Sequence, residues 1–258
     1  MLILAVDTST RMGSAALLRD SRVLAEISEY EETPYSTRLF RDIAALQERA
    51  NFNLDQVDVF AVAAGPGSFT GLRVGLTAVK AWSEIHGKPI AAISGLEAIA
   101  AEFLLGQEAS SSGESSNGGA PKVGGTAGAA KPRLIAPFLD GRRGQLFGAI
   151  YRRTSEDALG LALESDESIL SLDEFLEMVK GKSPESVQLV SPTPDVIPAT
   201  RVREILGEVS VIQVSAALAP AIGLLGLERA RRGEVVDSIR LDANYVRRSD
   251  AERFWRDG

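Results

Sequence analysis

The sequence predicts an α/β protein with two similar lobes. With 258 residues, of which 45% are hydrophobic, the chain is long enough for one large domain or two small ones. Three strand-like runs are followed by a helix, a strand, a helix, a strand and a helix, and part of this order returns later in the chain. Residues 106–132 contain almost no large apolar side chain. We therefore expect an amino-terminal lobe at 1–105, a flexible Gly/Ser-rich insertion at 106–132 and a carboxyl-terminal lobe at 133–258.

Apolar runs separated by polar or glycine turns predict the elements of the first lobe. We expect strands at 2–6, 14–18, 23–30, 57–64 and 90–94, and helices at 36–50, 71–86 and 95–105. Ser36 or Thr37 can cap the first helix. Gly87 can take the left-handed position that ends the second helix, and Pro89 prevents its continuation.

The second lobe is predicted from the same signals. We expect strands at 133–139, 145–153, 159–166, 187–191 and 211–214, and helices at 171–180, 200–206 and 215–232. Between the first two strands, the segment 140–145 reads as a charged hairpin turn in which Gly144 has a positive φ. Its arginines, Arg142 and Arg143, could alternatively contact a phosphate or a carboxylate of a partner.

Composition excludes several classes of protein. The formal charge of −7 argues against a chain that binds nucleic acid by itself, so a role with RNA requires a partner. Cysteine is absent, which leaves no disulfide framework and no thiolate site. We expect a cytoplasmic protein with no secretory signal and no membrane-spanning helix. The arginines that crowd the carboxyl end favour a solvated surface over an RNA contact.

Two segments are candidates for binding phosphate. Asp7 and Thr8 follow the first strand, where a carboxylate and hydroxyl groups can hold Mg²⁺ and phosphate; they can equally cap a β-turn. The glycine loop 65–71 precedes a helix that Ser68 or Thr70 can cap, so its N–H groups suit an anion. It lacks the Gly-Lys-Ser/Thr ending of a Walker loop and can equally be a tight strand-to-helix turn. The candidate phosphate- or nucleotide-binding residues are Asp7, Thr8, Ser68 and Thr70.

The helix after the glycine loop has two apolar stripes. One stripe consists of Leu72, Leu76 and Val79. The other contains Val74, Ala78, Ala81 and Ile85, and Trp82 broadens it. A helix that covers one face of a sheet needs only one stripe, so the second must meet another helix, another lobe or another chain. Packing against the first helix of the same chain explains it as well as a partner does.

No catalytic constellation is present in the sequence. The single histidine, His86, ends a helix, where it assists the helix dipole. We expect no catalytic residue, no metal site and no cofactor, because no cluster of histidine and cysteine exists to bind zinc or iron.

Four segments give the sequence a resemblance to the TsaB family of bacteria. They are LILAVDTST at the start, GPGSFTGLRVGL at 65–76, LDGRRGQLFGAIY at 139–151 and YVRRSDAE at 245–252. The resemblance implies a two-lobed actin-like ATPase fold (ASKHA, ribonuclease H-like) with duplicated mixed-sheet lobes. It also implies a non-catalytic subunit in tRNA threonylcarbamoyladenosine synthesis. Such a subunit dimerises with the TsaD-like transferase and activates it, with a TsaE-like ATPase as a further partner and tRNA reached only through the complex.

The resemblance places the pairing surface on the helices at 36–50 and 71–86, which could also form a homodimer. The expected interface residues are Leu39, Ile43, Gly71, Val74, Gly75, Ala78, Ala81, Trp82 and Ile85. The sequence departs from the family pattern at Tyr35, Gly141 and Ala243, where histidine, alanine and proline are frequent. An alternative remains an actin-like enzyme that binds ATP on its own, with Asp7, the glycine loop and Asp140 around the nucleotide. A metal-dependent protease is disfavoured because the ligands are missing.

Overall fold

The computed structural model describes residues 1–28, 33, 35–112, 133–154, 159–182 and 186–244. The described chain divides into two compact units, residues Met1–Ala98 with Ala217–Gly258, and residues Ile99–Ala216. Each unit contains one five-stranded mixed sheet. In the described ranges, no helix combines the length and the apolar character that a bilayer crossing requires.

The sheet of the first unit has the order β3-β2-β1-β4-β5. Its strands are β1 (Leu2–Asp7), β2 (Ser14–Arg19), β3 (Arg22–Ile27), β4 (Val59–Gly65) and β5 (Ile90–Ser94). The central strands β1 and β4 are buried along their whole length, which explains their continuous apolar sequences. Strands β1, β2 and β3 are antiparallel neighbours, whereas β4 and β5 run parallel to β1.

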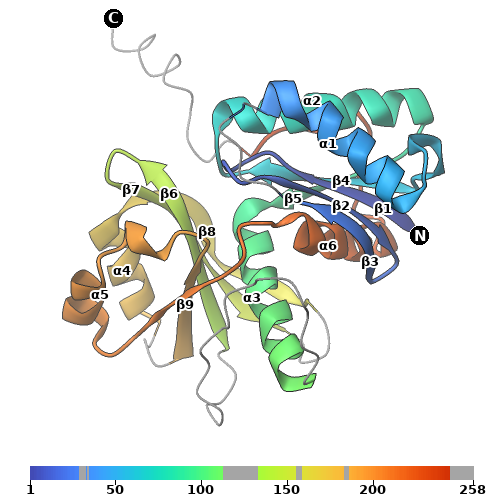
Figure 1. The fold of residues 1–258 in the computed structure, drawn as a ribbon. Coiled ribbons are helices and arrows are strands. Elements are labelled where there is room, and N and C mark those ends of the chain that lie inside the picture. Colours follow the sequence, from blue (N-terminus) through green and yellow to red (C-terminus); the bar gives the residue numbers. More distant parts are fainter. Residues whose placement is uncertain (29–32, 34, 113–132, 155–158, 183–185, 245–258) are drawn as a thin grey trace, which may run out of the picture. The chain divides into compact units, whose positions relative to one another are not determined.

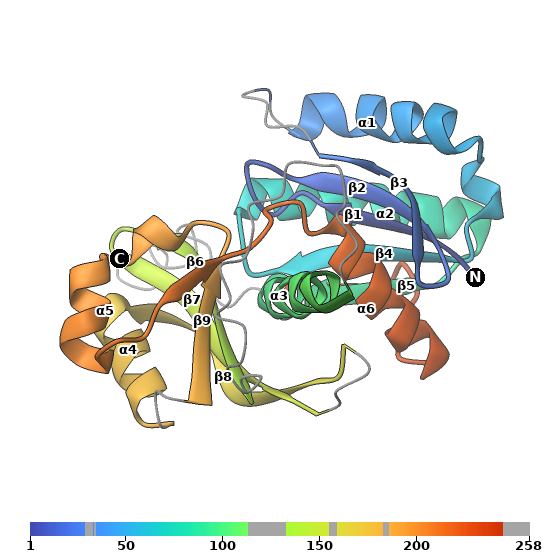
Figure 2. The same cartoon turned by 60° about the horizontal axis from the view of Figure 1, so that its bottom comes forward.

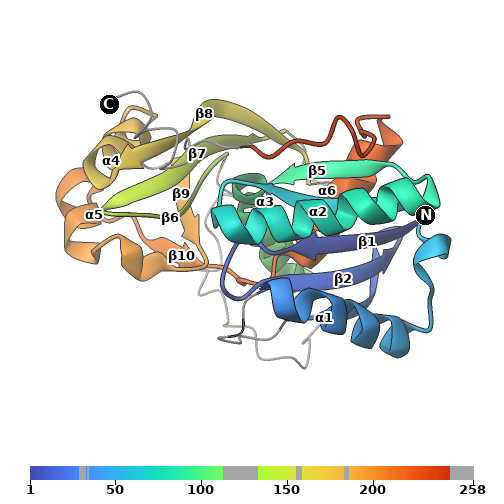
Figure 3. The same ribbon diagram turned by 90° about the horizontal axis from the view of Figure 1, so that it is seen from above.

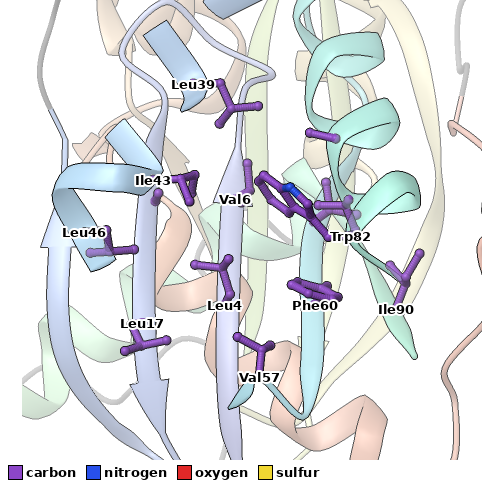
Figure 4. Close-up of a cluster of buried hydrophobic side chains, with 14 of the residues drawn as sticks. Leu4, Val6, Leu17, Leu39, Ile43, Leu46, Val57, Phe60, Trp82 and Ile90 are labelled. Atoms are coloured by element: carbon purple, nitrogen blue, oxygen red, sulfur yellow. The ribbon is translucent and has the colours of Figure 1, made fainter. Parts of the chain in front are cut away.

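Two helices cover one face of this sheet, as Figures 1 and 3 show. They are α1 (Tyr35–Ala50) and α2 (Phe69–His86). Leu39, Ile43 and Leu46 of α1 and Trp82 of α2 point toward Leu4, Val6 and Phe60 of the sheet (Figure 4). Helix α2 ends as predicted, because Gly87 takes the left-handed conformation with φ +62°.

The other face is covered by α6 (Ala219–Arg231), which contacts β1, β2, β4 and β5. Gly223 and Gly226 allow this close approach, since a Cβ on Gly223 would lie 2.3 Å from Leu18 Cδ1 and one on Gly226 2.7 Å from Ala61 Cβ.

The expected domain boundary at the carboxyl end differs from the structure. Residues 217–244 belong to the first unit, not to the lobe that begins at residue 133.

The sheet of the second unit repeats the topology of the first. Its order is β10-β9-β6-β7-β8, so its first strand is again central and its first three strands are again antiparallel. The strands are β6 (Leu134–Arg142), β7 (Gln145–Arg153), β8 (Leu161–Ser171), β9 (Val187–Ser191) and β10 (Val211–Gln213). Helices α4 (Leu172–Lys180) and α5 (Ala199–Leu206) lie together and bury apolar side chains against this sheet (Figure 2). The predicted duplicated α/β fold with a mixed sheet in each half is confirmed.

A few element boundaries differ from the prediction. Helix α3 (Gly95–Ser112) continues past residue 105, so residues 106–112, expected in the flexible insertion, are helical. The remainder of that insertion, 113–132, lies outside the described residues. Strand β8 extends to Ser171, whose side chain caps α4 in a capping box with Glu174. The last helix begins at Ala219, four residues later than expected.

Candidate functional site

Asp7 ends β1 in a fully buried position. Its Oδ1 accepts hydrogen bonds from the Ser9 N–H at 2.8 Å and from the Ser9 hydroxyl at 2.6 Å. Its Oδ2 has no hydrogen-bond partner among the described residues. Burial raises the pKa of the Asp7 carboxyl, and the two hydrogen bonds from Ser9 only partly oppose this shift.

The glycine loop packs directly on the turn that follows Asp7. Thr8 Oγ1 donates to the Gly71 carbonyl at 2.7 Å, and the Ser68 N–H donates to the Ser9 carbonyl at 2.8 Å. A Cβ on Gly71 would lie 2.0 Å from the Thr8 carbonyl oxygen, and one on Gly75 would lie 2.4 Å from Thr8 Oγ1. These glycines are therefore required by the close approach of two backbone segments of the same chain.

Three of the four candidate phosphate residues meet in this arrangement. Asp7, Thr8 and Ser68 are joined through the hydrogen bonds around Ser9 and Gly71, and the Ser68 hydroxyl caps α2 by accepting from the Gly71 N–H at 3.3 Å. Thr70 is exposed in the first turn of α2. The capped-turn interpretation accounts for every one of these hydrogen bonds, and phosphate binding at the four residues remains a prediction.

The turn between β1 and β2 is held from outside by two side chains of α1. The Tyr35 hydroxyl donates to the Met12 carbonyl at 2.7 Å, and Arg38 Nη2 donates to the same carbonyl at 2.6 Å. Arg38 is only 2% exposed. Gly13 has φ +49°, and the Tyr35 ring occupies the space that a Cβ on Gly13 would need. Sequence analysis did not predict the contact of Arg38 with the Met12 carbonyl, because an arginine in an amphipathic helix is usually exposed to solvent.

A strap at the carboxyl end, residues 234–244, reaches the glycine loop from the other side. Val236 forms an antiparallel bridge with Ile90 at the outer edge of β5. Leu241 is 2% exposed and belongs to the core of the first unit. The Asn244 N–H donates to the Ala64 carbonyl at 2.7 Å, and the Asn244 carbonyl oxygen lies 2.5 Å from where a Cβ on Gly65 would be. The arginines beyond this strap lie outside the described residues.

The second unit repeats one detail of the first. Asp140, near the end of β6, accepts from the N–H of Arg142 at 2.7 Å, just as Asp7 accepts from the N–H two residues later. Gly144 has the predicted positive φ, +74°, and Arg142 and Arg143 share the left-handed conformation. Both arginine side chains are exposed. The hairpin prediction is therefore confirmed, with two non-glycine residues in a conformation that favours glycine.

The nine expected interface residues fall into three groups by burial. Five of them are buried within the first unit and cannot contact a partner directly: Leu39, Ile43, Gly75, Ala78 and Trp82. Gly71 and Val74 are half-buried. Ala81 and Ile85 are exposed, Ile85 by 75%. Trp82 packs on Phe60 of β4 and on Phe40 of α1, so this member of the second stripe is explained by packing within the first unit.

Phe40, which the sequence analysis did not select for the interface, is 62% exposed on α1. It contacts Trp82, and Trp82 and Ile85 are neighbours one turn apart on α2. We define the α1–α2 surface as Phe40, Val74, Ala81 and Ile85. These four apolar side chains come from two neighbouring helices.

Within the described ranges, no group of three or more histidine, cysteine, aspartate or glutamate side chains is placed to hold a metal ion. His86, the single histidine, is half-buried in the last turn of α2. The residues of the site can position a loop or bind an anion.

Comparison with known proteins finds related sequences along the whole chain. The family described as "TsaD: tRNA N6-adenosine threonylcarbamoyltransferase" matches residues 28–112. The protein called "tRNA threonylcarbamoyladenosine biosynthesis protein TsaB" from Bacillus subtilis is 29% identical over 99% of this chain and 98% of its own length. The protein of the same name from Haemophilus influenzae is 36% identical over 42% of this chain and 45% of its own length.

The solved structure of YeaZ from Pseudomonas aeruginosa has the same fold, with a TM-score of 0.62 and 20% identity over 95% of this chain and 99% of that one. The shared fold agrees with this similarity in sequence. This chain is therefore similar to a TsaB protein over nearly its full length.

Proposed function

We propose that this chain is the non-catalytic scaffold subunit of a tRNA threonylcarbamoyladenosine modification complex, in which it dimerises with a TsaD-like transferase and activates it. The observation that carries the proposal is the similarity over 99% of the chain to a protein named for this biosynthesis. The absence of cysteine and the single half-buried histidine leave the chain few of the ligands on which a metal-dependent transferase relies.

The α1–α2 surface is the proposed contact with the transferase. The TsaD family matches residues 28–112, a range that contains both α1 and α2. A TsaD-like partner therefore has counterparts of the same helices, and each chain can offer an apolar helical surface to the other. Apolar side chains that a monomer leaves exposed on rigid helices are typical of a protein interface.

Co-elution in size-exclusion chromatography tests this contact. The wild-type chain should co-elute with the TsaD-like protein of the same genome, and Ile85→Glu should abolish co-elution because it would bury an unpaired charge. Leu163→Glu in β8, which replaces a 51% exposed side chain of the second unit, is the matched control and should co-elute normally. If Ile85→Glu binds as well as the control, the contact does not use this surface. The same surface could support a homodimer, which would then also be lost in Ile85→Glu.

Activation needs its own measurement. Formation of threonylcarbamoyladenosine in tRNA should be assayed with the TsaD-like transferase, the TsaE-like ATPase, ATP and an activated threonylcarbamoyl donor, with and without this chain. We expect the product to form only when the wild-type chain is present, and the chain alone to modify no tRNA. Product formed at the same rate without the chain would contradict an activating role.

The alternative, an actin-like enzyme that binds ATP alone, has weaker support from the geometry. The Asp7 Oδ1 and the Thr8 hydroxyl are already engaged with the chain's own backbone and with Ser9. Titration calorimetry of the isolated chain with Mg-ATP distinguishes the two proposals, and we expect no heat of binding.

A further inference from the structure

We infer that Phe40 is the anchor residue through which the α1–α2 surface binds its partner, and that Trp82 holds its ring in place before binding. This inference rests on the proposed function, because it concerns the same surface and the same TsaD-like occupant. It adds that Phe40, which is not among the nine expected interface residues, contributes most of the binding free energy at this surface.

Phe40 is distinguished by its exposure. Its neighbours on α1, Leu39 and Ile43, are 2% and 3% exposed, whereas Phe40 is 62% exposed. Among the large apolar side chains described in α1 and α2, Ile85 alone is more exposed. An aromatic ring can bury more apolar area on binding than an isoleucine can, and aromatic residues dominate the binding energy of protein interfaces.

The Phe40 ring is already oriented in the free chain. Its centroid lies 6.3 Å from that of Trp82 at an interplanar angle of 87°, an edge-to-face contact. Trp82 is 6% exposed and lies 5.9 Å from the fully buried ring of Phe60. A row of three aromatic rings thus connects the core of the first unit to its surface. A ring fixed in this way loses little side-chain entropy on binding, which increases the affinity that its burial provides.

The surroundings of Phe40 suit an anchor with a polar rim. Arg41, the next residue along α1, is exposed and pairs with Asp42 at 3.0 Å, so α1 offers charged groups for the rim of a contact centred on Phe40. Such a rim excludes water from a buried apolar contact. The occupant is the corresponding helical surface of a TsaD-like protein, because the TsaD family match covers this part of the chain.

Phe69 provides a matched control within the same unit. It is also an exposed phenylalanine, at 37%, but the guanidinium of Arg73 lies 3.9 Å from its ring centroid. One face of its ring is therefore already covered by the chain itself. Removal of this ring should affect binding much less than removal of Phe40.

The test measures the affinity of purified variants for the TsaD-like protein of the same genome by biolayer interferometry. Phe40→Ala should weaken binding by about thirtyfold or more, as expected for an anchor residue, and Phe40→Trp should restore most of the affinity. Phe69→Ala should change affinity by less than about threefold. The melting temperature of Phe40→Ala should fall by no more than about 4 °C, which separates a loss of contact from a loss of fold.

Two results separate the failure of this inference from that of the proposed function. If Phe40→Ala binds like wild type while Ile85→Glu does not bind, the surface is correct and Phe40 is not its anchor. If the wild-type chain does not bind at all, or if Ile85→Glu binds normally, the proposed contact is wrong and the inference falls with it. Equal weakening by Phe40→Ala and Phe69→Ala would also overturn the anchor assignment.

Discussion

The guanidinium carbon of Arg38 lies 4.0 Å from the centroid of the Tyr35 ring, and both side chains donate hydrogen bonds to the carbonyl of Met12. The two residues are one turn apart at the start of α1. Through them the helix that carries the proposed partner surface also fixes the turn between β1 and β2. Because Arg38 is buried, its removal would take one of two donors from the Met12 carbonyl and the Arg38 donor from the Arg11 carbonyl, in a place that water does not easily reach.

We expect Arg38→Ala to lower the free energy of unfolding by about 2–4 kcal/mol, through the lost hydrogen bonds and the space left behind. Arg38→Lys should fall between this variant and wild type, because lysine keeps the charge but not the planar fork of donors. Urea unfolding followed by circular dichroism measures the change. Arg41→Ala, three residues away on the exposed side of α1, is the control and should stay within about 0.5 kcal/mol of wild type. A loss for Arg38→Ala no larger than for Arg41→Ala would contradict the structural role.

The buried carboxyl of Asp7 should give the protein a distinctive pH dependence. Its pKa in the folded state is raised above the ordinary value of 3.8, so the folded state binds this proton more tightly than the unfolded state does. The contribution of Asp7 to stability is therefore largest at low pH and is lost as pH rises through the raised pKa. The free energy of unfolding of Asp7→Asn, relative to wild type, should increase with pH in this range by at most about 1.4 kcal/mol per pH unit.

Chemical unfolding of both proteins between pH 4 and pH 8 checks this prediction. Asp140→Asn serves as the comparison, because Asp140 holds the equivalent turn in the second unit but is exposed. A difference between Asp7→Asn and wild type that stays constant over the whole range would mean that burial does not control the protonation of Asp7.

Gly75 should tolerate no larger residue. In Gly75→Ala the new Cβ would lie 2.4 Å from Thr8 Oγ1, so Thr8 would have to give up its hydrogen bond to Gly71 or α2 would have to move. We expect a loss of about 1–3 kcal/mol in the free energy of unfolding. Gly181→Ala at the end of α4 is the control: its φ is −64°, its nearest contact to a Cβ is an ordinary 3.5 Å, and alanine should be neutral or slightly stabilising there. Equal effects at both positions would argue against the close packing of α2 on the turn.

The two stripes of α2 should respond differently to charge. Val79 is fully buried, so Val79→Asp should unfold the first unit. Ala81 is exposed, so Ala81→Glu should keep its melting temperature and lose its association with the TsaD-like partner. Ala78 is 5% exposed, and a charge there should destabilise the chain itself. Thermal melts of the single chain, compared with chromatography of the mixture, distinguish these outcomes. An Ala81→Glu chain that melts as early as Val79→Asp would show that this position is core.

The carboxyl-terminal strap should contribute to stability through one side chain. Leu241→Ala should lower the free energy of unfolding by about 2–4 kcal/mol, because Leu241 is buried in the core beside β5. Ile239→Ala, two residues earlier and 88% exposed, should have almost no effect on unfolding by urea. If the two variants are equally stable, the strap is not docked on the first unit as described.

Much of the fold could be predicted because its signals are local. The apolar runs gave the strands in order, and Ser68 and Gly87 marked the ends of α2. The return of α6 to the first sheet could not be read in this way. Its glycines suggest close packing, but no pattern states that the surface opposite Gly226 is Ala61, far away in the chain. Long-range pairing of this kind is decided by the complementary shapes of both surfaces.

In the candidate site too, local sequence predicts some residues and misses others that depend on contacts between distant segments. The positions of Asp7 and Ser68 at strand and helix ends follow from local sequence, and so did their selection. Arg38 was missed because its charge is typical of an exposed helix face, whereas in the structure it is buried in contact with the Met12 carbonyl and the Tyr35 ring. Phe40 was missed for the opposite reason, since an aromatic residue beside Leu39 reads as part of the core.

The first unit is assembled from both ends of the chain, and this affects how it can form during translation. The ribosome synthesises residues 95–218 after β5 is complete and before the first residue of α6 appears. During that time one face of the sheet that contains β1 and β4 has no helix to cover it. Exposed sheet surface in a nascent chain is prone to aggregate, so completion of this unit depends on α6, which is synthesised after the second unit. A stop codon before residue 219 would leave that face permanently bare.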